Sequence, residues 1–229
     1  MKYKFVLFDA DNTLFDYDLA EMTSFQKTLN YFKILENFEQ FYESYKIVNH
    51  QIWQEFEDGL ISSKKLRVER FIRFAKQENL KIDAVKMSQK YIEFLGECTF
   101  LLDGALEISE YLSDKCELAL ITNGIADVQN RRFAKSELAK FYQHRFISDE
   151  IGFQKPDKGI FEFVFSKLKC VDKKSAIIIG DNRNSDIKGG NDFGIDTCWY
   201  NIRKCEKNEI IPTFEISKLS ELKNILEEK

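Results

Sequence analysis

Four short apolar runs, separated by longer amphipathic stretches, constrain the fold of this chain more than any other feature. The runs lie at 3–8 (YKFVLF), 117–122 (ELALIT), 176–180 (AIIIG) and 195–200 (IDTCWY). Their length and their β-branched or aromatic content are typical of buried strands. Helical spacing marks 104–113, 125–140, 157–168 and 184–193, and 217–228 predicts a closing helix. This alternation predicts an α/β fold, a Rossmann-like, doubly wound parallel sheet with helices on both faces.

Residues 16–98 follow a different pattern. They contain no convincing strand, and apolar and charged positions alternate at helical spacing, as in FEQFYESYKIVNHQIWQEF. Gly59 and the Ile-Ser-Ser that follows it mark a turn, where Ser62 or Ser63 can cap the next helix. We therefore expect an all-helical insert of about four helices at 16–98, and an α/β core formed by 1–15 and 99–229.

Composition and charge narrow the location and the partners. The net charge is −4, which gives no electrostatic reason to expect nucleic acid as the main partner. The five cysteines are scattered without a CxxC pair, which suits reduced thiols. Only four apolar residues follow Lys4, too few for a signal peptide, and no apolar run approaches the ~18 residues of a membrane span. We expect a cytoplasmic protein without a membrane partner, and either a monomer or a homodimer.

Polar residues stand where the predicted strands end. In an open parallel sheet, ligands bind outside the carboxyl ends of the strands. A lone Asp-x-Asp pair is usually a solvated turn, but here several polar groups are expected at one edge of the sheet. They are Asp9 and Asp11 after the first strand, Thr122, Asn123 and Gly124 after the second, Asp181 and Asp186 after the third, and Lys155 in the loop before the helix that leads to it.

These groups together meet one chemical requirement. Acidic groups that converge without a cation repel one another, and Mg²⁺ accepts oxygen ligands. A hydroxyl such as that of Thr122, an ammonium such as that of Lys155 and backbone N–H groups at helix starts bind phosphoryl oxygens. A carboxylate can attack phosphorus to form an aspartyl-phosphate. The set predicts phosphoryl transfer.

The same residues carry a resemblance to a known family. The stretch DADNTLFD resembles the DxDx[TV] signature of the haloacid dehalogenase-like (HAD) superfamily. ITNG, QKP and GDNRNSD resemble its second, third and fourth motifs, in the same order along the chain. The match extends from residue 5 to about residue 200, and the helical insert resembles the family's cap domain of the first type.

The resemblance implies a role for each motif residue. Asp9 would be the nucleophile and Asp11 the general acid–base. Members that remove halogen lack the second aspartate, so Asp11 favours phosphatase or phosphomutase chemistry. Phosphoryl oxygens would be held by Thr122 and Lys155, with Asn123 and Gly124 beside them, and Mg²⁺ by Asp9, the backbone carbonyl of Asp11, Asp181 and Asp186.

A narrower resemblance concerns the substrate. The segment YKIVNHQIWQEFEDGLISSKKL, the entry motif FDADNTLFDYD and the later TCWYN resemble a bacterial subgroup of pyrimidine 5′-nucleotidases, which act on dUMP, dTMP and UMP. One alternative is a phosphatase for a small metabolite, such as phosphoglycolate or a sugar phosphate. Another is a catalytically silent phosphate-binding protein, although such a protein would be expected to lack Asp9 or Lys155.

Discrimination between nucleotides requires groups beyond the phosphate. In the insert, Asn49 offers hydrogen bonds to a base edge and Trp53 offers stacking, and Phe15 is expected to line the same cleft. A site that hydrogen-bonds a base rejects analogues far better than apolar contact alone. Asn49 and Trp53 could equally hold two helices of the insert together. The sequence predicts a preference for pyrimidine over purine monophosphates.

Overall fold

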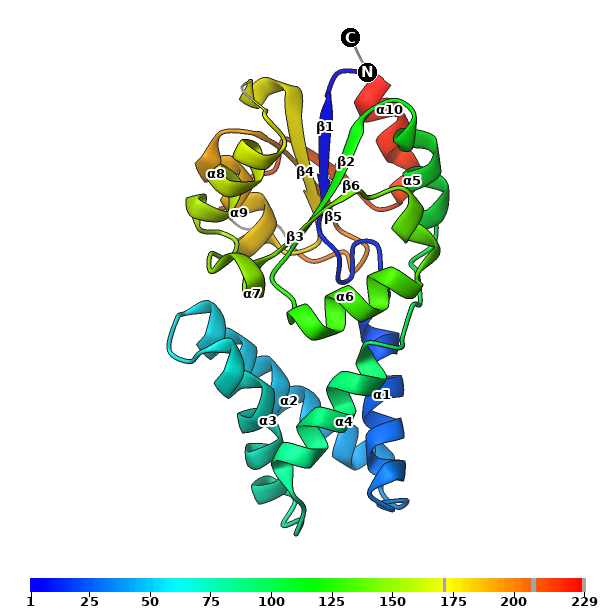
Figure 1. The fold of residues 1–229 in the computed structure, drawn as a ribbon, viewed down its shortest axis with the longest axis vertical. Helices are drawn as coiled ribbons and strands as arrows, with labels where there is room; N and C mark the ends of the chain where they lie inside the picture. The colour runs from blue at the N-terminus through cyan, green and yellow to red at the C-terminus, as the bar shows by residue number, and fades with distance from the viewer. Residues whose placement is uncertain (171, 207–208, 228–229) are drawn as a thin grey trace. The chain divides into compact units, whose positions relative to one another are not determined.

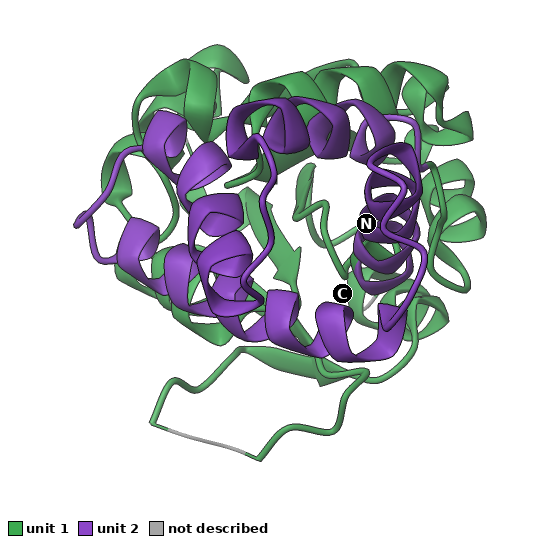
Figure 2. Ribbon diagram, turned by 90° about the horizontal axis from the view of Figure 1, so that it is seen from below, with its two compact units in different colours: residues 1–17, 99–229 green, residues 18–98 purple. Residues whose placement is uncertain are grey.

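The computed structural model describes residues 1–170, 172–206 and 209–227, and the chain forms two compact units. One unit contains residues 1–17 and 99–229, and the other contains residues 18–98 (Figure 2). The chain therefore leaves the first unit shortly after the first strand and returns to it before the second strand.

A parallel sheet of six strands forms the centre of the first unit (Figure 1). The strand order is β3-β2-β1-β4-β5-β6, and every neighbouring pair is parallel. This arrangement confirms the predicted doubly wound α/β fold. The strands are β1 (Phe5–Phe8), β2 (Glu117–Thr122), β3 (His144–Ile147), β4 (Ala176–Gly180), β5 (Asp196–Tyr200) and β6 (Phe214–Ile216).

Helices cover both faces of this sheet, and alternate strand residues supply the two cores. In β1, Val6 and Phe8 pack with residues of α5 and α10, whereas Phe5 and Leu7 pack with residues of α8 and α9 (Figure 1). The helices of this unit are α5 (Ala105–Ser113), α6 (Ala126–Lys135), α7 (Ser148–Ile151), α8 (Lys158–Lys167), α9 (Lys188–Phe193) and α10 (Leu222–Glu227).

Several elements differ from the predicted ones. The strands β3 and β6 were not predicted. The helix predicted over 125–140 is interrupted at Ser136, whose backbone is extended and whose hydroxyl accepts a hydrogen bond from the Leu138 N–H. A π-helical turn (Arg183–Ile187) precedes α9. The closing helix begins at Leu222, and residue 228 of its predicted range lies outside the described residues.

The second unit is helical, as the spacing of its apolar residues predicts. Ser62 caps its third helix by accepting a hydrogen bond from the Lys65 N–H at 3.3 Å. Its core is aromatic: the Phe25 and Tyr45 rings stack at 4.4 Å, and Phe71 lies against the other side of the cluster. Across the described residues, no helix has the length and apolar character that a membrane span requires. The helices are α1 (Tyr17–Tyr31), α2 (Phe38–Glu57), α3 (Ser63–Gln77) and α4 (Ala84–Leu95).

Candidate active site

The candidate site lies at the carboxyl ends of β1 and β4, which are neighbours in the centre of the sheet. From β1 the chain builds the sheet outward through β2 and β3 on one side, and then returns to β4 on the other. Such a switch of direction leaves a crevice beyond the strand ends where ligands bind. Asp9 and Asp181 are the first residues after these two strands.

Three carboxylates converge at this point. Oxygen atoms of Asp9, Asp181 and Asp186 all lie within 4.8 Å of one another. These are three of the four residues that the sequence predicts as metal ligands. The fourth, Asp11, was predicted to bind through its backbone carbonyl, and its carboxylate is not part of this group.

Lys155 is the cation at the centre of the cluster, and it is buried. Its ammonium donates to Asp9 Oδ1 at 2.6 Å, to Asp186 Oδ1 at 2.6 Å and to the Ile121 carbonyl at 2.7 Å. An ammonium has three N–H donors, so all three are used. Asn123 fixes the backbone of Lys155 through two hydrogen bonds of 2.8 Å, one donated and one accepted. Any further acceptor for Lys155 must therefore replace one of these three.

Burial and mutual repulsion raise the pKa values of the acidic groups. Burial raises the pKa of Asp9 to about 7, against the opposing charge of Lys155 and with support from Asp186 and Asp11. Burial, together with the charges of Asp9 and Asp186, raises the pKa of Asp181 well above its usual value. Burial opposes the charged form of Lys155, but Asp186 and Asp9 outweigh it and raise the pKa of its ammonium. One ammonium does not compensate three carboxylates.

Gly180 leaves the space that Asp186 occupies. A Cβ on Gly180 would lie 2.1 Å from Asp186 Oδ2 and 2.6 Å from the Asp186 Cβ. The other contact of this carboxylate is the Asn182 N–H, which donates to Oδ2 at 3.0 Å. The glycine of the GDNRNSD motif is thus a steric requirement for bringing the second aspartate of the motif to Lys155.

Thr13 joins the two strand-end aspartates, a role that the sequence analysis missed. Its hydroxyl donates to Asp9 Oδ2 at 3.2 Å and accepts from the Asp181 N–H at 3.1 Å. A tight turn places it there: Asn12 has a positive φ of 58°, and the Phe15 N–H donates to the Ala10 carbonyl. Thr13 occupies the last position of the DxDx[TV] signature, which was the available signal.

Asp11 faces away from the carboxylate cluster and toward helix α6. Its Oδ2 accepts from Gln129 Nε2 at 2.7 Å, and its Oδ1 forms an ion pair with Arg132. Neither partner was predicted from the sequence. Gly124 makes room for the first of them, because a Cβ there would lie 2.1 Å from Gln129 Nε2. The two aspartates of the first motif are therefore held by different groups.

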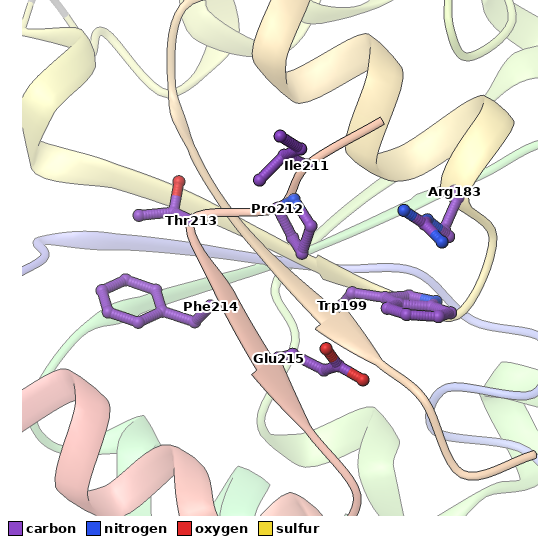
Figure 3. A pocket seen from close by; sticks show the side chains of 7 residues that line it. All are labelled: Arg183, Trp199, Ile211, Pro212, Thr213, Phe214 and Glu215. Atoms are coloured by element: carbon purple, nitrogen blue, oxygen red, sulfur yellow. The ribbon is translucent and has the colours of Figure 1, made fainter. Parts of the chain in front are cut away.

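A second layer lies behind Asp181. The Trp199 indole donates to the Asp181 carbonyl at 2.9 Å, and the Arg183 guanidinium lies 4.4 Å above the indole ring (Figure 3). Arg183 also donates to the carbonyls of Glu206 and Ile210. The adjoining cavity of about 240 Å³ is smaller than typical small-molecule pockets. Its lining consists of Arg183, Trp199, Ile211, Pro212, Thr213, Phe214 and Glu215 (Figure 3).

The structure places the other predicted site residues as follows. Thr122 is buried at the end of β2, where its hydroxyl accepts from the Gly124 N–H at 3.0 Å. Phe15 is fully buried in the core beside Phe133, so the predicted contact with a substrate requires the ring to become exposed. The loop from Thr122 to Gly124 thus adjoins the cluster through Lys155, whereas Phe15 belongs to the packing around it.

The two predicted residues of the helical unit have partners inside that unit. Asn49 donates to Glu21 Oε1 at 2.8 Å and accepts from Arg70 at 3.2 Å, which links α1, α2 and α3. Burial raises the pKa of Glu21 to about 7. Trp53 is half-buried, with the Phe56 ring at 5.7 Å. These contacts fit the helix-joining alternative, and the predicted contacts with a nucleotide stay predictions.

Comparison with known proteins shows where such a site is found. A family model described as haloacid dehalogenase-like hydrolase matches residues 3–194. The HAD-hydrolase YfnB of Bacillus subtilis is 37% identical over 98% of this chain and 96% of its own. A crystal structure of YfnB bound to magnesium covers both chains completely, with a TM-score of 0.93 and 35% identity.

Two further relatives have named activities. The pyrimidine 5′-nucleotidase YjjG of Escherichia coli is 32% identical over 99% of both chains. The pyrimidine 5′-nucleotidase PynA of Streptococcus pneumoniae is 34% identical over 99% of this chain and 98% of its own. The similarity therefore extends over both units and is not confined to the motifs.

Proposed function

The chain belongs to the haloacid dehalogenase-like hydrolase family, and we propose that this phosphomonoesterase is a Mg²⁺-dependent 5′-nucleotidase for pyrimidine nucleoside monophosphates. The observation that carries the chemistry is the placement of Asp9, Lys155, Asp181 and Asp186 in one cluster beyond β1 and β4. The observation that carries the substrate class is the full-length similarity to two pyrimidine 5′-nucleotidases.

In the first half of the proposed reaction, a carboxylate oxygen of Asp9 attacks the phosphorus of the substrate. The bond from phosphorus to the nucleoside 5′-oxygen breaks, and Asp11 protonates that oxygen as it leaves. Thr122 and Lys155 bind the phosphoryl oxygens, which requires Lys155 to exchange one of its three present acceptors. The product of this half is an aspartyl-phosphate on Asp9 and a free nucleoside.

In the second half, water attacks the phosphorus of the aspartyl-phosphate. Asp11, now a carboxylate, takes a proton from that water, and the bond between phosphorus and the Asp9 oxygen breaks. Phosphate leaves, and both aspartates return to their starting forms. The same residue serves as acid and then as base, so a single group beside the leaving oxygen suffices.

The residues present fit a divalent cation. Three carboxylates face one ammonium, and the raised pKa values of Asp9 and Asp181 reflect repulsion and burial that a bound cation would relieve. Hard oxygen donors of this kind suit Mg²⁺. Asp9, Asp181, Asp186 and the Asp11 carbonyl would hold the ion, which would neutralise the negative charge of the phosphoryl group.

The alternatives make different predictions for a panel of substrates. We expect kcat/KM for UMP, dUMP and dTMP to exceed that for AMP, GMP, phosphoglycolate and glucose 6-phosphate by at least about tenfold, because recognition of a base edge discriminates strongly. The measurement is phosphate release by the purified protein with Mg²⁺, and an Asp9→Asn preparation made in parallel corrects for contaminating phosphatases.

Two outcomes of the panel would contradict the proposal. Faster hydrolysis of phosphoglycolate or glucose 6-phosphate would favour the small-metabolite phosphatase. No release from any substrate would favour the silent phosphate-binding protein. We also propose a cytoplasmic location, which the five cysteines support because none forms a disulfide.

Removal of the metal should change stability in a pH-dependent way. Asp9 has a folded-state pKa of about 7, above the usual value, so the metal-free fold gains stability as pH falls through 7 and loses it as pH rises. At pH 8 we expect Mg²⁺ at about 100 times its Kd to raise the Tm by about 5–10 °C. At pH 6 the increment should shrink because protons compete for the same carboxylates.

The comparison of Tm with Mg²⁺ and with EDTA isolates this effect. Glu21, whose pKa is also raised to about 7, contributes equally to both conditions and cancels. Asp181→Asn is the matched variant, because it removes one carboxylate from the cluster with little change of shape. A Mg²⁺ increment that is the same in this variant, or larger at pH 6 than at pH 8, would contradict the proposed metal site.

A further inference from the structure

Arg132 is a buried cation whose interactions are concentrated on Asp11. It lies on α6, 121 residues from Asp11 in sequence, and its side chain is fully buried, whereas that of Asp11 is 26% exposed. One guanidinium nitrogen, Nη2, bonds both to Asp11 and to Gln129 Oε1, the latter at 2.9 Å. Within the part of the chain that the structure describes, Nε and Nη1 of Arg132 have no hydrogen-bond partner.

This arrangement is poor as a purely stabilising device. A buried guanidinium with unsatisfied donors costs free energy, and apolar residues of similar volume often replace buried ion pairs without loss of stability. What the arrangement does provide is geometric: Gln129 bonds Oδ2 of Asp11 while Arg132 bonds Oδ1, so both carboxylate oxygens are fixed. The Gln129 bond depends in turn on the missing Cβ of Gly124.

The position of Arg132 is itself fixed by packing. The guanidinium lies 4.4 Å from the Phe15 ring, and that ring packs edge-on against Phe133 at 5.7 Å. Phe15 follows Asp11 in the same tight turn, and Phe133 is the next residue after Arg132 on α6. The orientation of the Asp11 carboxylate is therefore referred to a helix and an aromatic pair, and not only to its own loop.

We infer that Arg132, with Gln129, is the positioning residue for Asp11 in the proposed phosphatase reaction, and that it acts on the rate of proton transfer through Asp11 without touching the substrate. The inference rests on the proposed function, because it assumes that Asp11 exchanges the proton with the leaving oxygen. An acid–base group displaced by about 1 Å loses about 10²-fold in rate. Loss of Arg132 should therefore lower kcat and leave KM nearly unchanged.

The test is a double-mutant cycle measured with two substrates. We expect Arg132→Met to lower kcat for UMP by about 10–100-fold, with KM changed by less than about threefold. The loss should be much smaller for p-nitrophenyl phosphate, whose leaving group needs no proton. In an Asp11→Asn background, Arg132→Met should change kcat by less than about twofold, because the group through which it acts is already gone.

Further variants separate positioning from folding. Arg145→Met is the matched control: Arg145 lies 5.5 Å from the Phe133 ring, so it contacts the same aromatic pair without contacting Asp11, and kcat should be unchanged. Gln129→Leu removes the other bond to Asp11 and should give a smaller loss with the same substrate dependence, which tests the inference even where Arg132→Met fails to fold.

The outcomes distinguish this inference from the proposed function. Equal losses for UMP and p-nitrophenyl phosphate in Asp11→Asn itself would overturn the acid–base role of Asp11. If Asp11→Asn shows the expected substrate dependence, three results would overturn the role of Arg132 alone. These are unchanged kcat in both folded variants, equal losses for both substrates, and a further loss of 10-fold or more when Arg132→Met is added to Asp11→Asn.

Discussion

Replacement of Asp9 by Asn is expected to lower kcat for UMP by at least about 10⁴-fold, because an amide cannot form the aspartyl-phosphate. The shape of the side chain is nearly unchanged, and the amide oxygen can still accept a hydrogen bond from Lys155 or Thr13. Phosphate release with Mg²⁺, measured alongside the wild type, gives the size of the loss.

The same variant makes a second, opposite prediction about stability. Burial and neighbouring charge raise the pKa of Asp9 to about 7, so its ionised form destabilises the metal-free fold above that pH. At pH 8 in EDTA, Asp9→Asn should therefore unfold at a Tm equal to or above that of the wild type. Turnover within tenfold of the wild type, or a large loss of Tm, would contradict the role given to Asp9.

Replacement of Lys155 by Met should affect both activity and stability. The ammonium is the cation that contacts Asp9 and Asp186 in the cluster, and it is itself buried. Removal of one partner from a buried ion pair leaves uncompensated charge and costs about 3–5 kcal/mol of unfolding free energy. Activity should fall by at least about 10²–10³-fold, because a donor to the phosphoryl group is lost.

Lys188→Met is the matched control for this change. Lys188 forms a 2.6 Å ion pair with Asp192, but both side chains are about half exposed, and such pairs contribute about 0–1 kcal/mol. Denaturant unfolding and phosphate release should therefore be close to wild type for Lys188→Met and strongly impaired for Lys155→Met. Similar behaviour of the two variants would contradict the central position of Lys155.

Much of the fold could be predicted because the four central strands are short, apolar runs buried on both faces. The predictions of a parallel α/β sheet, of the hydrolase family and of the enzyme class are confirmed. The strands β3 and β6 were missed because they form the edges of the sheet. β3 reads HRFI, with His144 and Arg145 polar, and β6 has only three residues, so neither shows a clear apolar run.

The candidate site divides in the same way. Residues in motifs at strand ends could be brought together on paper, because parallel strands end at one edge of the sheet. The contacts of Asp11 could not, because Gln129 and Arg132 lie about 120 residues away. One signal was available: both occupy the face of α6 that buries Val128 and Phe133, where a polar side chain needs a partner.

The most direct test of the account is a search for the covalent intermediate. The protein is mixed with UMP that carries radiolabelled phosphate, quenched in acid within a single turnover and digested. The account predicts label that is stable in acid, released by hydroxylamine as expected of an acyl-phosphate, and carried by the peptide that contains Asp9. Phosphate release without labelled protein, or label on a peptide that lacks Asp9, would contradict it.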